Sequence, residues 1–327
     1  MTDLIYRPRR LRINQLVRDM VAETTLKIDG MIQPYFVCEG KAIKNEIPSM
    51  PGIYRESPDS LLKSIADDFE LGIKRVMLFG VPDTKDAAAS SALGENAIVN
   101  VAIRELKDKF GEKLFVVADV CLCAYTDSGH CGIVANGRVD NDKTLPVLRR
   151  MAIDLAKSGC DCVAPSDMMD GRVGEIRNGL DDEGFTDTII MAYSAKYASA
   201  YYGPFRDAAG SAPQEGDRRG YQMDYRNRRE ALKEIALDID EAADIIMIKP
   251  ALPYLDIIVQ ARSMFELPIA AYNVSGEYSM VKLMARAGHA DEQQLVLENL
   301  TAITRAGADI ILTYHLRDIL KQGWLGG

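Results

Sequence analysis

Short apolar runs alternate with helical patterns along most of the chain. The runs rich in β-branched residues have the length of buried strands and lie at residues 32–37, 75–79, 114–122, 160–164, 188–193, 245–248, 268–274 and 310–314. Between them, apolar residues recur with a helical period, as at residues 60–70, 98–109, 145–157, 227–239, 254–265, 280–287 and 293–305. This alternation predicts a parallel (β/α)8 barrel, the TIM-barrel fold. A doubly wound open sheet is the alternative, but no glycine-rich dinucleotide fingerprint follows the first strand.

Glycine closes several of the predicted helices. Gly72, Gly159 and Gly307 each stand between the end of a helical pattern and the next apolar run. Glycine adopts the left-handed conformation that ends helices without a steric penalty, so a strand can follow at once. Ala242 occupies the corresponding place before the sixth apolar run.

Residues 1–28 stand apart from this alternation, and we predict an N-terminal arm (1–28) followed by a barrel domain (29–327). Residues 7–12 are basic, and Pro8 argues against a helix there. Asn14 is expected to cap a short amphipathic helix that runs through Thr25. A basic arm in an acidic chain suggests an acidic partner, such as a neighbouring subunit in a homo-oligomer. A frayed, solvated terminus is the alternative.

Composition narrows the class of protein. The chain has 327 residues, enough to bury a large core, and its formal net charge of −9 argues against nucleic acid as the main partner. No apolar run approaches membrane-spanning length, and the N-terminus lacks the apolar segment of a secretory signal. Six cysteines without such a signal are better explained as reduced thiols or metal ligands than as disulfides. We therefore expect a cytoplasmic protein with no membrane partner.

Two lysines follow apolar strands, where the burial of an ammonium group is expensive. Lys249 ends the sixth run just before Pro250, and Lys196 follows the fifth run after Ser194 and Ala195. Neighbouring strands would place them side by side, so each charge disfavours the other and one lysine becomes a neutral nucleophile. Such an amine attacks a ketone to form a Schiff base. The alternative is that the side chains snorkel to solvent past the strand ends.

A cysteine-rich segment follows the third run. Asp119, Cys121 and Cys123 alternate in sequence and are expected to share one face of a strand, while the loop through Gly129 can return Cys131 to them. Three thiolates select zinc and leave its fourth position open, which is the catalytic arrangement. If His130 also bound, the site would be closed and structural. Free cysteines without a metal are the third possibility.

A glycine- and proline-rich stretch at residues 201–220 has no apolar period and predicts a lid. It carries Arg206, Arg218 and Arg219. Arginines above two lysines suit a substrate with a carboxylate, which a guanidinium group holds through paired hydrogen bonds. Solvated loop charges are the alternative for each arginine.

Long, chemically unusual strings extend over nearly the whole chain. They are RPRRLR, RDMVAETTL, LFGVP, DVCLCAYTDSGHCG, APSDMMDGRV, MAYSAKYASAYYGPFRDAAGSAP, GDRRGYQMDYRNRREAL, IMIKPALPYLD, VSGEY and RAGADIILTY. Together they resemble the porphobilinogen synthase (5-aminolaevulinate dehydratase) family, in its zinc-cysteine type. The resemblance implies a (β/α)8 barrel whose arm grips a neighbouring subunit, commonly in an octamer. It also implies a hydro-lyase of tetrapyrrole (haem and chlorophyll) biosynthesis, which condenses two 5-aminolaevulinate molecules to porphobilinogen with loss of two waters.

The resemblance also implies roles for individual residues. Lys249 and Lys196 match the family's Schiff-base lysines. The remaining matches are Arg206 and Arg218 for the carboxylate of one substrate, Ser275 and Tyr314 for that of the other, Cys121, Cys123 and Cys131 for zinc, and Glu234 for a second, allosteric magnesium. Asp119 is a candidate for proton transfer because it is expected to face both the metal site and the barrel mouth.

The chain departs from the family pattern in three places. Ala242 stands where the family usually has glycine, the loop at residues 85–96 is alanine-rich, and Gln214 and Glu215 look inserted in the lid. Two other functions remain open. A Schiff-base aldolase for sugar phosphates explains one lysine but neither the second lysine nor the cysteines, and a non-catalytic zinc scaffold requires a closed metal site.

Overall fold

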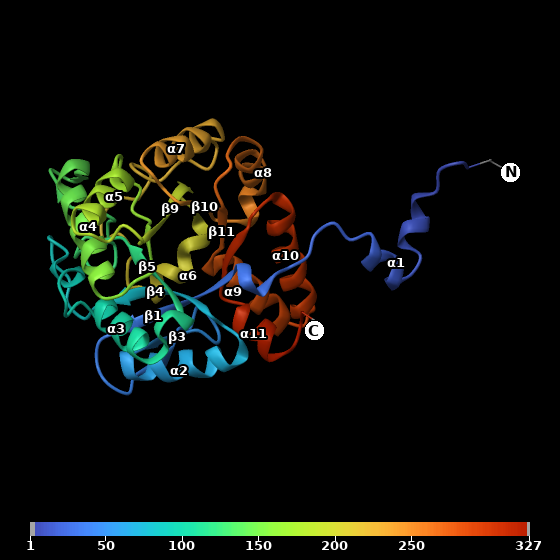
Figure 1. Cartoon of the computed structure of the whole chain (residues 1–327), viewed down its shortest axis with the longest axis horizontal. Helices are drawn as coiled ribbons and strands as arrows, with labels where there is room; N and C mark the ends of the chain where they lie inside the picture. The colour runs from blue at the N-terminus through green and yellow to red at the C-terminus, as the bar shows by residue number, and fades with distance from the viewer. Residues whose placement is uncertain (1–3, 326–327) are drawn as a thin grey trace.

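Parallel strands close into a barrel in the computed structural model, which describes residues 4–325 (Figure 1). The barrel closes because β12 (Ile310–Thr313) pairs with β1 (Met31–Cys38) as well as with β11 (Ile269–Asn273). The other barrel strands are β4 (Arg75–Val81), β5 (Phe115–Val120), β8 (Cys162–Pro165), β9 (Ile189–Lys196) and β10 (Ile245–Lys249). Their order around the barrel follows the chain, so the predicted (β/α)8 fold is confirmed and the open sheet is excluded.

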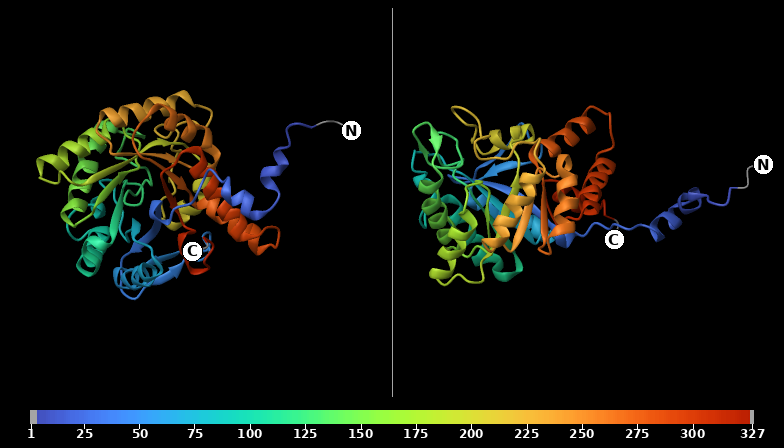
Figure 2. Two further views of the ribbon diagram at one scale, coloured as in Figure 1. Left: turned by 45° about the vertical axis from the view of Figure 1, so that its right-hand side comes forward. Right: turned by 90° about the horizontal axis from the view of Figure 1, so that it is seen from above.

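Helices surround the barrel (Figures 1 and 2). They are α2 (Pro58–Leu71), α3 (Ile98–Phe110), α4 (Asn141–Lys157), α5 (Arg172–Asp182), α7 (Arg229–Asp240), α8 (Leu255–Met264), α9 (Ser275–Arg286), α10 (Glu292–Ala306) and α11 (Leu316–Lys321). Strand side chains alternate between two apolar layers. Phe36 and Met77 lie in the barrel interior, whereas Val37 and Leu78 pack in the layer that includes the helices.

Short strands and 3-10 helices are added to the barrel. β3 (Tyr54–Glu56) runs parallel to the end of β1, β2 (Lys44–Glu46) pairs antiparallel with β3, and β6 (Val134–Ala135) forms a hairpin with β7 (Arg138–Val139). The connections between the barrel elements contain the 3-10 helices η2 (Ile28–Gly30), η3 (Ser90–Ala92), η4 (Gly111–Lys113), η5 (Ala200–Tyr202) and η6 (Leu252–Tyr254). Within residues 4–325, no helix has the length and apolar character required to span a membrane.

The predicted helix closures are present. Gly72, Gly159 and Gly307 have φ angles of 110°, 96° and 118°. Ala242 has a φ of 69°, so it occupies the left-handed region despite its Cβ. The left-handed conformation costs an L-residue with a Cβ roughly 1–2 kcal/mol.

Ala242→Gly should therefore raise the free energy of unfolding by about 1 kcal/mol, and with it the thermal midpoint. This figure already subtracts the extra freedom that glycine gives the unfolded chain. Ala242 is exposed, so the lost methyl group removes little packing. Ala236→Gly within α7 is the matched control and should destabilise the protein by about 1 kcal/mol, because that alanine has helical geometry. Denaturation of both variants measures the difference, and an Ala242→Gly variant no more stable than the parent would contradict the account.

The N-terminal arm extends away from the barrel (Figure 2). Two expectations for it were wrong in detail. Pro8 begins a 3-10 helix, η1 (Pro8–Arg12), because the first turn of a helix does not need the missing N–H. Asn14 does cap α1 (Gln15–Met20) by accepting from the Val17 N–H at 3.0 Å, but the helix ends at Met20 rather than Thr25. Neither helix buries a side chain within this chain.

Candidate active site

The two lysines meet at the carboxyl end of the barrel. The register of β9 and β10 pairs Lys249 directly with Lys196. Their exposed fractions are only 5% and 4%, so neither side chain snorkels to solvent. The carboxyl end of the strands is where enzymes of this fold place their active sites.

Aromatic rings enclose Lys249. Its Nζ lies 4.3 Å from the ring centre of Tyr272, 5.0 Å from that of Tyr193 and 5.1 Å from that of Phe205. Burial, with the nearby charge of Lys196, lowers the pKa of Lys249 to about 7. A large part of this amine is therefore neutral at neutral pH and competent to attack a carbonyl group.

Polar groups flank Lys196. Its Nζ donates a hydrogen bond to the carbonyl oxygen of Ser166 at the end of β8. Burial raises the pKa of Asp119 to about 6, although the charges of Lys196 and Lys249 lower it. Among the described residues, Oδ1 of Asp119 has no hydrogen-bond partner. A carboxyl group with a pKa near neutrality, beside two amines, is suited to proton transfer.

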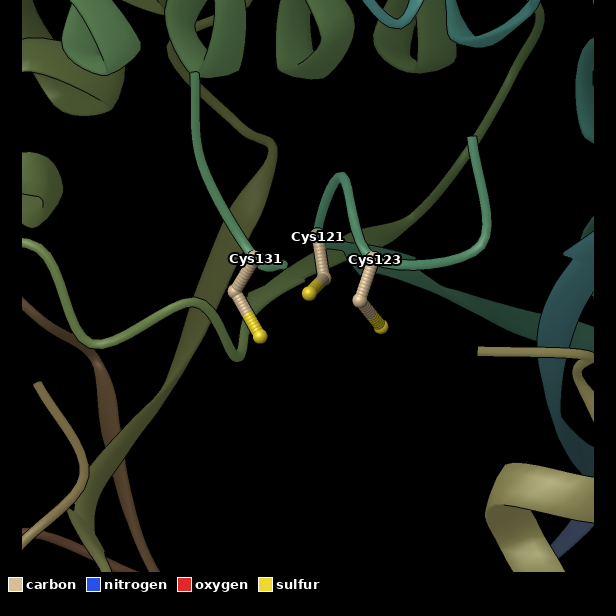
Figure 3. Close-up of side chains that lie close together, drawn as sticks. All are labelled: Cys121, Cys123 and Cys131. Atoms are coloured by element: carbon tan, nitrogen blue, oxygen red, sulfur yellow. The ribbon is translucent and has the colours of Figure 1, made fainter. Parts of the chain in front are cut away.

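The three cysteines converge (Figure 3). The Sγ atoms of Cys121, Cys123 and Cys131 all lie within 4.8 Å of one another, and all three residues are buried. The sequence suggested that strand alternation would place Cys121 and Cys123 on one face. This was wrong, because β5 ends at Val120 and the loop that follows folds back. Hydrogen bonds from the other two thiols hold the pKa of Cys131 well below its usual range. Three soft sulfur atoms at this spacing fit a zinc ion.

His130 points away from this cluster. Its Nδ1 lies 3.1 Å from the hydroxyl oxygen of Tyr221, and its Nε2 lies 3.0 Å from the carbonyl oxygen of Glu215. The part of the chain that the structure describes therefore supplies three thiols, and no imidazole, to the cluster. This geometry favours an open site over a closed one.

The lid contains more structure than its sequence suggested. It includes the short helix α6 (Gly203–Ala208), which carries Arg206. Arg218 is 5% exposed, and its Nη2 donates to the carbonyl oxygen of Gly129 at 2.9 Å and to that of Ser211. Arg219 instead faces solvent and pairs with Asp217 at 3.6 Å.

Arg206 and Arg218 line a cavity of about 550 Å³ together with Gln222. In residues 4–325, the Nε atoms of both arginines lack a hydrogen-bond partner, as do both side-chain polar atoms of Gln222. Buried polar groups are normally paired, so the Nε–H groups of the two arginines and the amide NH₂ of Gln222 suit an anionic ligand. Burial and the charge of Arg218 lower the pKa of Arg206, which is the expected effect of two cations held close together.

Ser275 and Tyr314 lie at the same end of the barrel. Ser275 begins α9, where its Oγ accepts from the Phe205 N–H at 3.0 Å. The hydroxyl oxygen of Tyr314 lies 2.9 Å from that of Tyr272, whose ring packs against Lys249. Both residues are 1% exposed. The two hydroxyls thus lie just beyond the ends of β11 and β12, the two strands that follow β10 and its Lys249.

Glu234 lies elsewhere. It projects from α7 into a cavity of about 1080 Å³, which Asp170 and Glu230 also line and which shares Arg219 and Gln222 with the cavity beside Arg206. Burial raises the pKa of Glu234, and the charge of Arg172 lowers it. The structure does not bring Glu234 to the lysines, so any ion held there would act at a distance.

The barrel and the two buried lysines at the carboxyl ends of its strands define the class of protein: a (β/α)8-barrel enzyme. The family model described as delta-aminolevulinic acid dehydratase matches residues 5–322. The chain belongs to this family. That membership excludes both the sugar-phosphate aldolase and the non-catalytic scaffold.

Individual relatives agree. The delta-aminolevulinic acid dehydratase of Synechococcus elongatus is 54% identical over 324 residues, 98% of each chain. That of Halalkalibacterium halodurans is 51% identical over 319 residues, 98% of this chain and 96% of the relative. The Toxoplasma gondii porphobilinogen synthase, solved in complex with its reaction product porphobilinogen, superposes with a TM-score of 0.96 at 44% identity, covering 98% of this chain and 92% of that one.

Proposed function

We propose that this protein condenses two molecules of 5-aminolaevulinate to porphobilinogen with loss of two waters, through Schiff bases at Lys249 and Lys196. The observation that carries the proposal is the direct pairing of these two buried lysines across β9 and β10. The named activity of the relatives supports the choice of substrate.

The chemistry starts at Lys249. Its neutral amine attacks the ketone carbon of one substrate, and loss of water gives a Schiff base. Lys196 binds the second ketone in the same way, and Asp119 exchanges protons with the reacting atoms. Two tethered substrates react as one molecule, which removes much of the entropic barrier to condensation.

Each substrate also has a carboxylate. We assign that of the Lys249-bound molecule to the hydroxyls of Ser275 and Tyr314, which lie just beyond the ends of β11 and β12. We assign that of the Lys196-bound molecule to Arg206 and Arg218. Both line the lid cavity, and their Nε atoms have no hydrogen-bond partner among the described residues. Two different carboxylate sites would hold the two substrates in different orientations, as an asymmetric condensation requires.

Zinc is the metal that we propose for Cys121, Cys123 and Cys131, since three clustered thiols fit it. When bound, it would supply a Lewis acid with an open position for the second substrate. At Glu234 we propose magnesium, which keeps several waters and needs only one or two carboxylates. Asp170 and Glu230 line the same cavity and add negative charge.

The direct test of this function is product formation. Purified protein loaded with zinc should convert 5-aminolaevulinate to porphobilinogen with a stoichiometry of two substrates to one product.

Arg206→Met should raise KM strongly, because it removes a proposed carboxylate ligand. Glu215→Gln is the control and should change KM far less, because Glu215 lies in the lid and contacts His130 only through its backbone carbonyl. Failure to form porphobilinogen with zinc present would contradict the proposal.

We also propose that the arm binds a neighbouring subunit in a homo-octamer, and that the protein acts in the cytoplasm. The arm exposes apolar side chains that this chain does not cover; Ile5, Ile13 and Leu16 are 80%, 74% and 81% exposed. Exposed apolar clusters of this kind mark protein interfaces. Six cysteines, none of which is paired in a disulfide among the described residues, fit a reducing compartment.

Deletion of residues 1–12 should give smaller assemblies with lower activity. Ile13→Asp with Leu16→Asp should do the same in the full-length chain, because charges would then enter an apolar contact. Tyr225→Asp, a change at a 64% exposed residue outside the arm, is the matched control and should keep the assembly. Sedimentation velocity measures the size, and an unchanged assembly after deletion would favour the solvated-terminus alternative.

A further inference from the structure

One buried carboxylate connects the strand ends that carry Lys249 and Ser275. Glu277 is 2% exposed and is the third residue of α9. Its Oε1 accepts from the Leu252 N–H at 2.6 Å, and its Oε2 accepts from the Val274 N–H at 2.5 Å. Leu252 follows Lys249 by three positions, and Val274 immediately precedes Ser275.

The connection extends to β12. Asn273 Nδ2 donates to Oε2 of Glu277 at 3.3 Å, and Thr313 Oγ1 donates to Oδ1 of Asn273 at 3.0 Å. Thr313 Oγ1 in turn accepts from the His315 N–H at 3.2 Å. Tyr314 lies between these two bonded residues in the chain. Asn273 and Thr313 are 1% and 0% exposed. The network therefore joins the ends of β10, β11 and β12 in the protein interior.

Helix capping alone does not explain this arrangement. A capping carboxylate needs only the N–H at the start of its helix, here that of Val274. The second oxygen of Glu277 instead binds the loop after β10, beyond the last residue pair of the β10–β11 ladder, Ile248 with Ala271. Burial raises the pKa of Glu277, and the N–H groups of Leu252, Val274 and Asn273 oppose that rise. Because both of its oxygens accept from these N–H groups, the contacts fit the ionised carboxylate.

We propose that Glu277 is a positioning residue that sets the separation between Lys249 and the hydroxyls of Ser275 and Tyr314. A single substrate molecule bound through its ketone and its carboxylate must span that separation. The proposal rests on the function proposed above, which assigns both anchors to one molecule. Preorganised anchors lower the entropic cost of holding a ligand, and small displacements lose much of that advantage.

A pair of ketones tests this role. 4-Oxopentanoate has the ketone and carboxylate of the substrate at the same spacing, whereas 2-pentanone has the ketone alone. Borohydride should trap both on Lys249 of the zinc-loaded protein, 4-oxopentanoate at far lower concentration. Glu277→Gln replaces one accepting oxygen with an NH₂ group that faces a backbone N–H. It should reduce the advantage of 4-oxopentanoate over 2-pentanone about 10- to 100-fold, the effect of one hydrogen bond to a charged group.

Two further variants complete the test. Thr313→Val removes one link of the network at nearly constant volume and should lower the same ratio by less, which keeps the test available if Glu277→Gln does not fold. Glu56→Gln is the matched control: Glu56 is also 2% exposed and bonds Ser64 and Lys44, outside this network. It should reduce thermal stability without changing the ratio.

The outcomes separate the two proposals. An unchanged ratio of 4-oxopentanoate to 2-pentanone trapping in both Glu277→Gln and Thr313→Val would overturn the inference. If trapping of both ketones also falls equally, the role of Glu277 is merely structural. If the parent protein labels Lys249 with neither ketone, the Schiff-base function itself is wrong and the inference falls with it.

Discussion

Lys249→Ala should abolish the formation of porphobilinogen while leaving the protein folded. No other described lysine combines burial in an aromatic enclosure with a pKa lowered to about 7. Lys196, its strand partner, donates to the carbonyl of Ser166 and would remain to bind one substrate only. Activity assays and circular dichroism of the variant make the measurement. An active Lys249→Ala protein would contradict the mechanism.

Lys249→Met adds a stability readout. A pKa of about 7 in place of 10.5 makes the buried ammonium unfavourable to the fold by roughly 4 kcal/mol at pH 7. Because the folded pKa lies below the unfolded one, this cost is largest below pH 7 and disappears above pH 10.5. The apolar variant should therefore be more stable than the parent by a few kcal/mol at neutral pH, and the difference should shrink as pH rises.

The same pKa governs reactivity. Only the neutral amine attacks the ketone, so trapping of substrate on Lys249 should rise about tenfold per pH unit below its pKa of about 7 and then level off. An exposed lysine would continue to gain reactivity up to a pH near 10. Trapping that keeps rising through pH 9 would show that burial does not lower the pKa of Lys249.

Removal of the metal should abolish activity with little loss of thermal stability, and zinc should restore the activity. A structural zinc contributes folding energy directly, but this barrel has an extensive apolar core of its own. Lead and thiol-reactive agents should inhibit, because the ligands are soft. Metal analysis, activity and thermal melting of the chelated protein make the comparison.

Variants identify the ligands. Cys121→Ala, Cys123→Ala and Cys131→Ala should each lose zinc. His130→Ala should retain it, because both ring nitrogens of His130 contact other groups. Cys160→Ala is the matched control, a buried cysteine whose Sγ donates to a backbone carbonyl outside the cluster. Full activity after chelation, or zinc retention that depends on His130 as much as on the cysteines, would count against a catalytic, three-thiol site.

The barrel and the lysine pair were predictable because both follow from local patterns. Apolar runs and helical periods mark the strands and helices, and parallel neighbours in chain order place Lys196 beside Lys249. The glycine closures were equally visible, including the substitution at Ala242. These signals depend on residues close together in sequence.

Other features depend on contacts that sequence spacing does not encode. The loop after Val120, rather than strand alternation, gathers the cysteines. Helix α6 forms where the lid packs on the barrel mouth: Arg55 donates to the carbonyl oxygen of Ala208 at 2.7 Å, across 153 positions of the chain. The contact of Glu277 with Leu252 could not be predicted from spacing, because the two residues lie 25 positions apart, although an acid within the apolar surroundings of the VSGEY string was a signal.

The central claim is that two neighbouring lysines hold the substrate covalently, and borohydride trapping with 5-aminolaevulinate followed by peptide mass mapping tests it most directly. The account predicts a reduced substrate adduct on Lys249, and a second on Lys196 at high substrate loading, with the other lysines unmodified. Adducts confined to exposed lysines, or no adduct at all in a protein that still forms product, would contradict it.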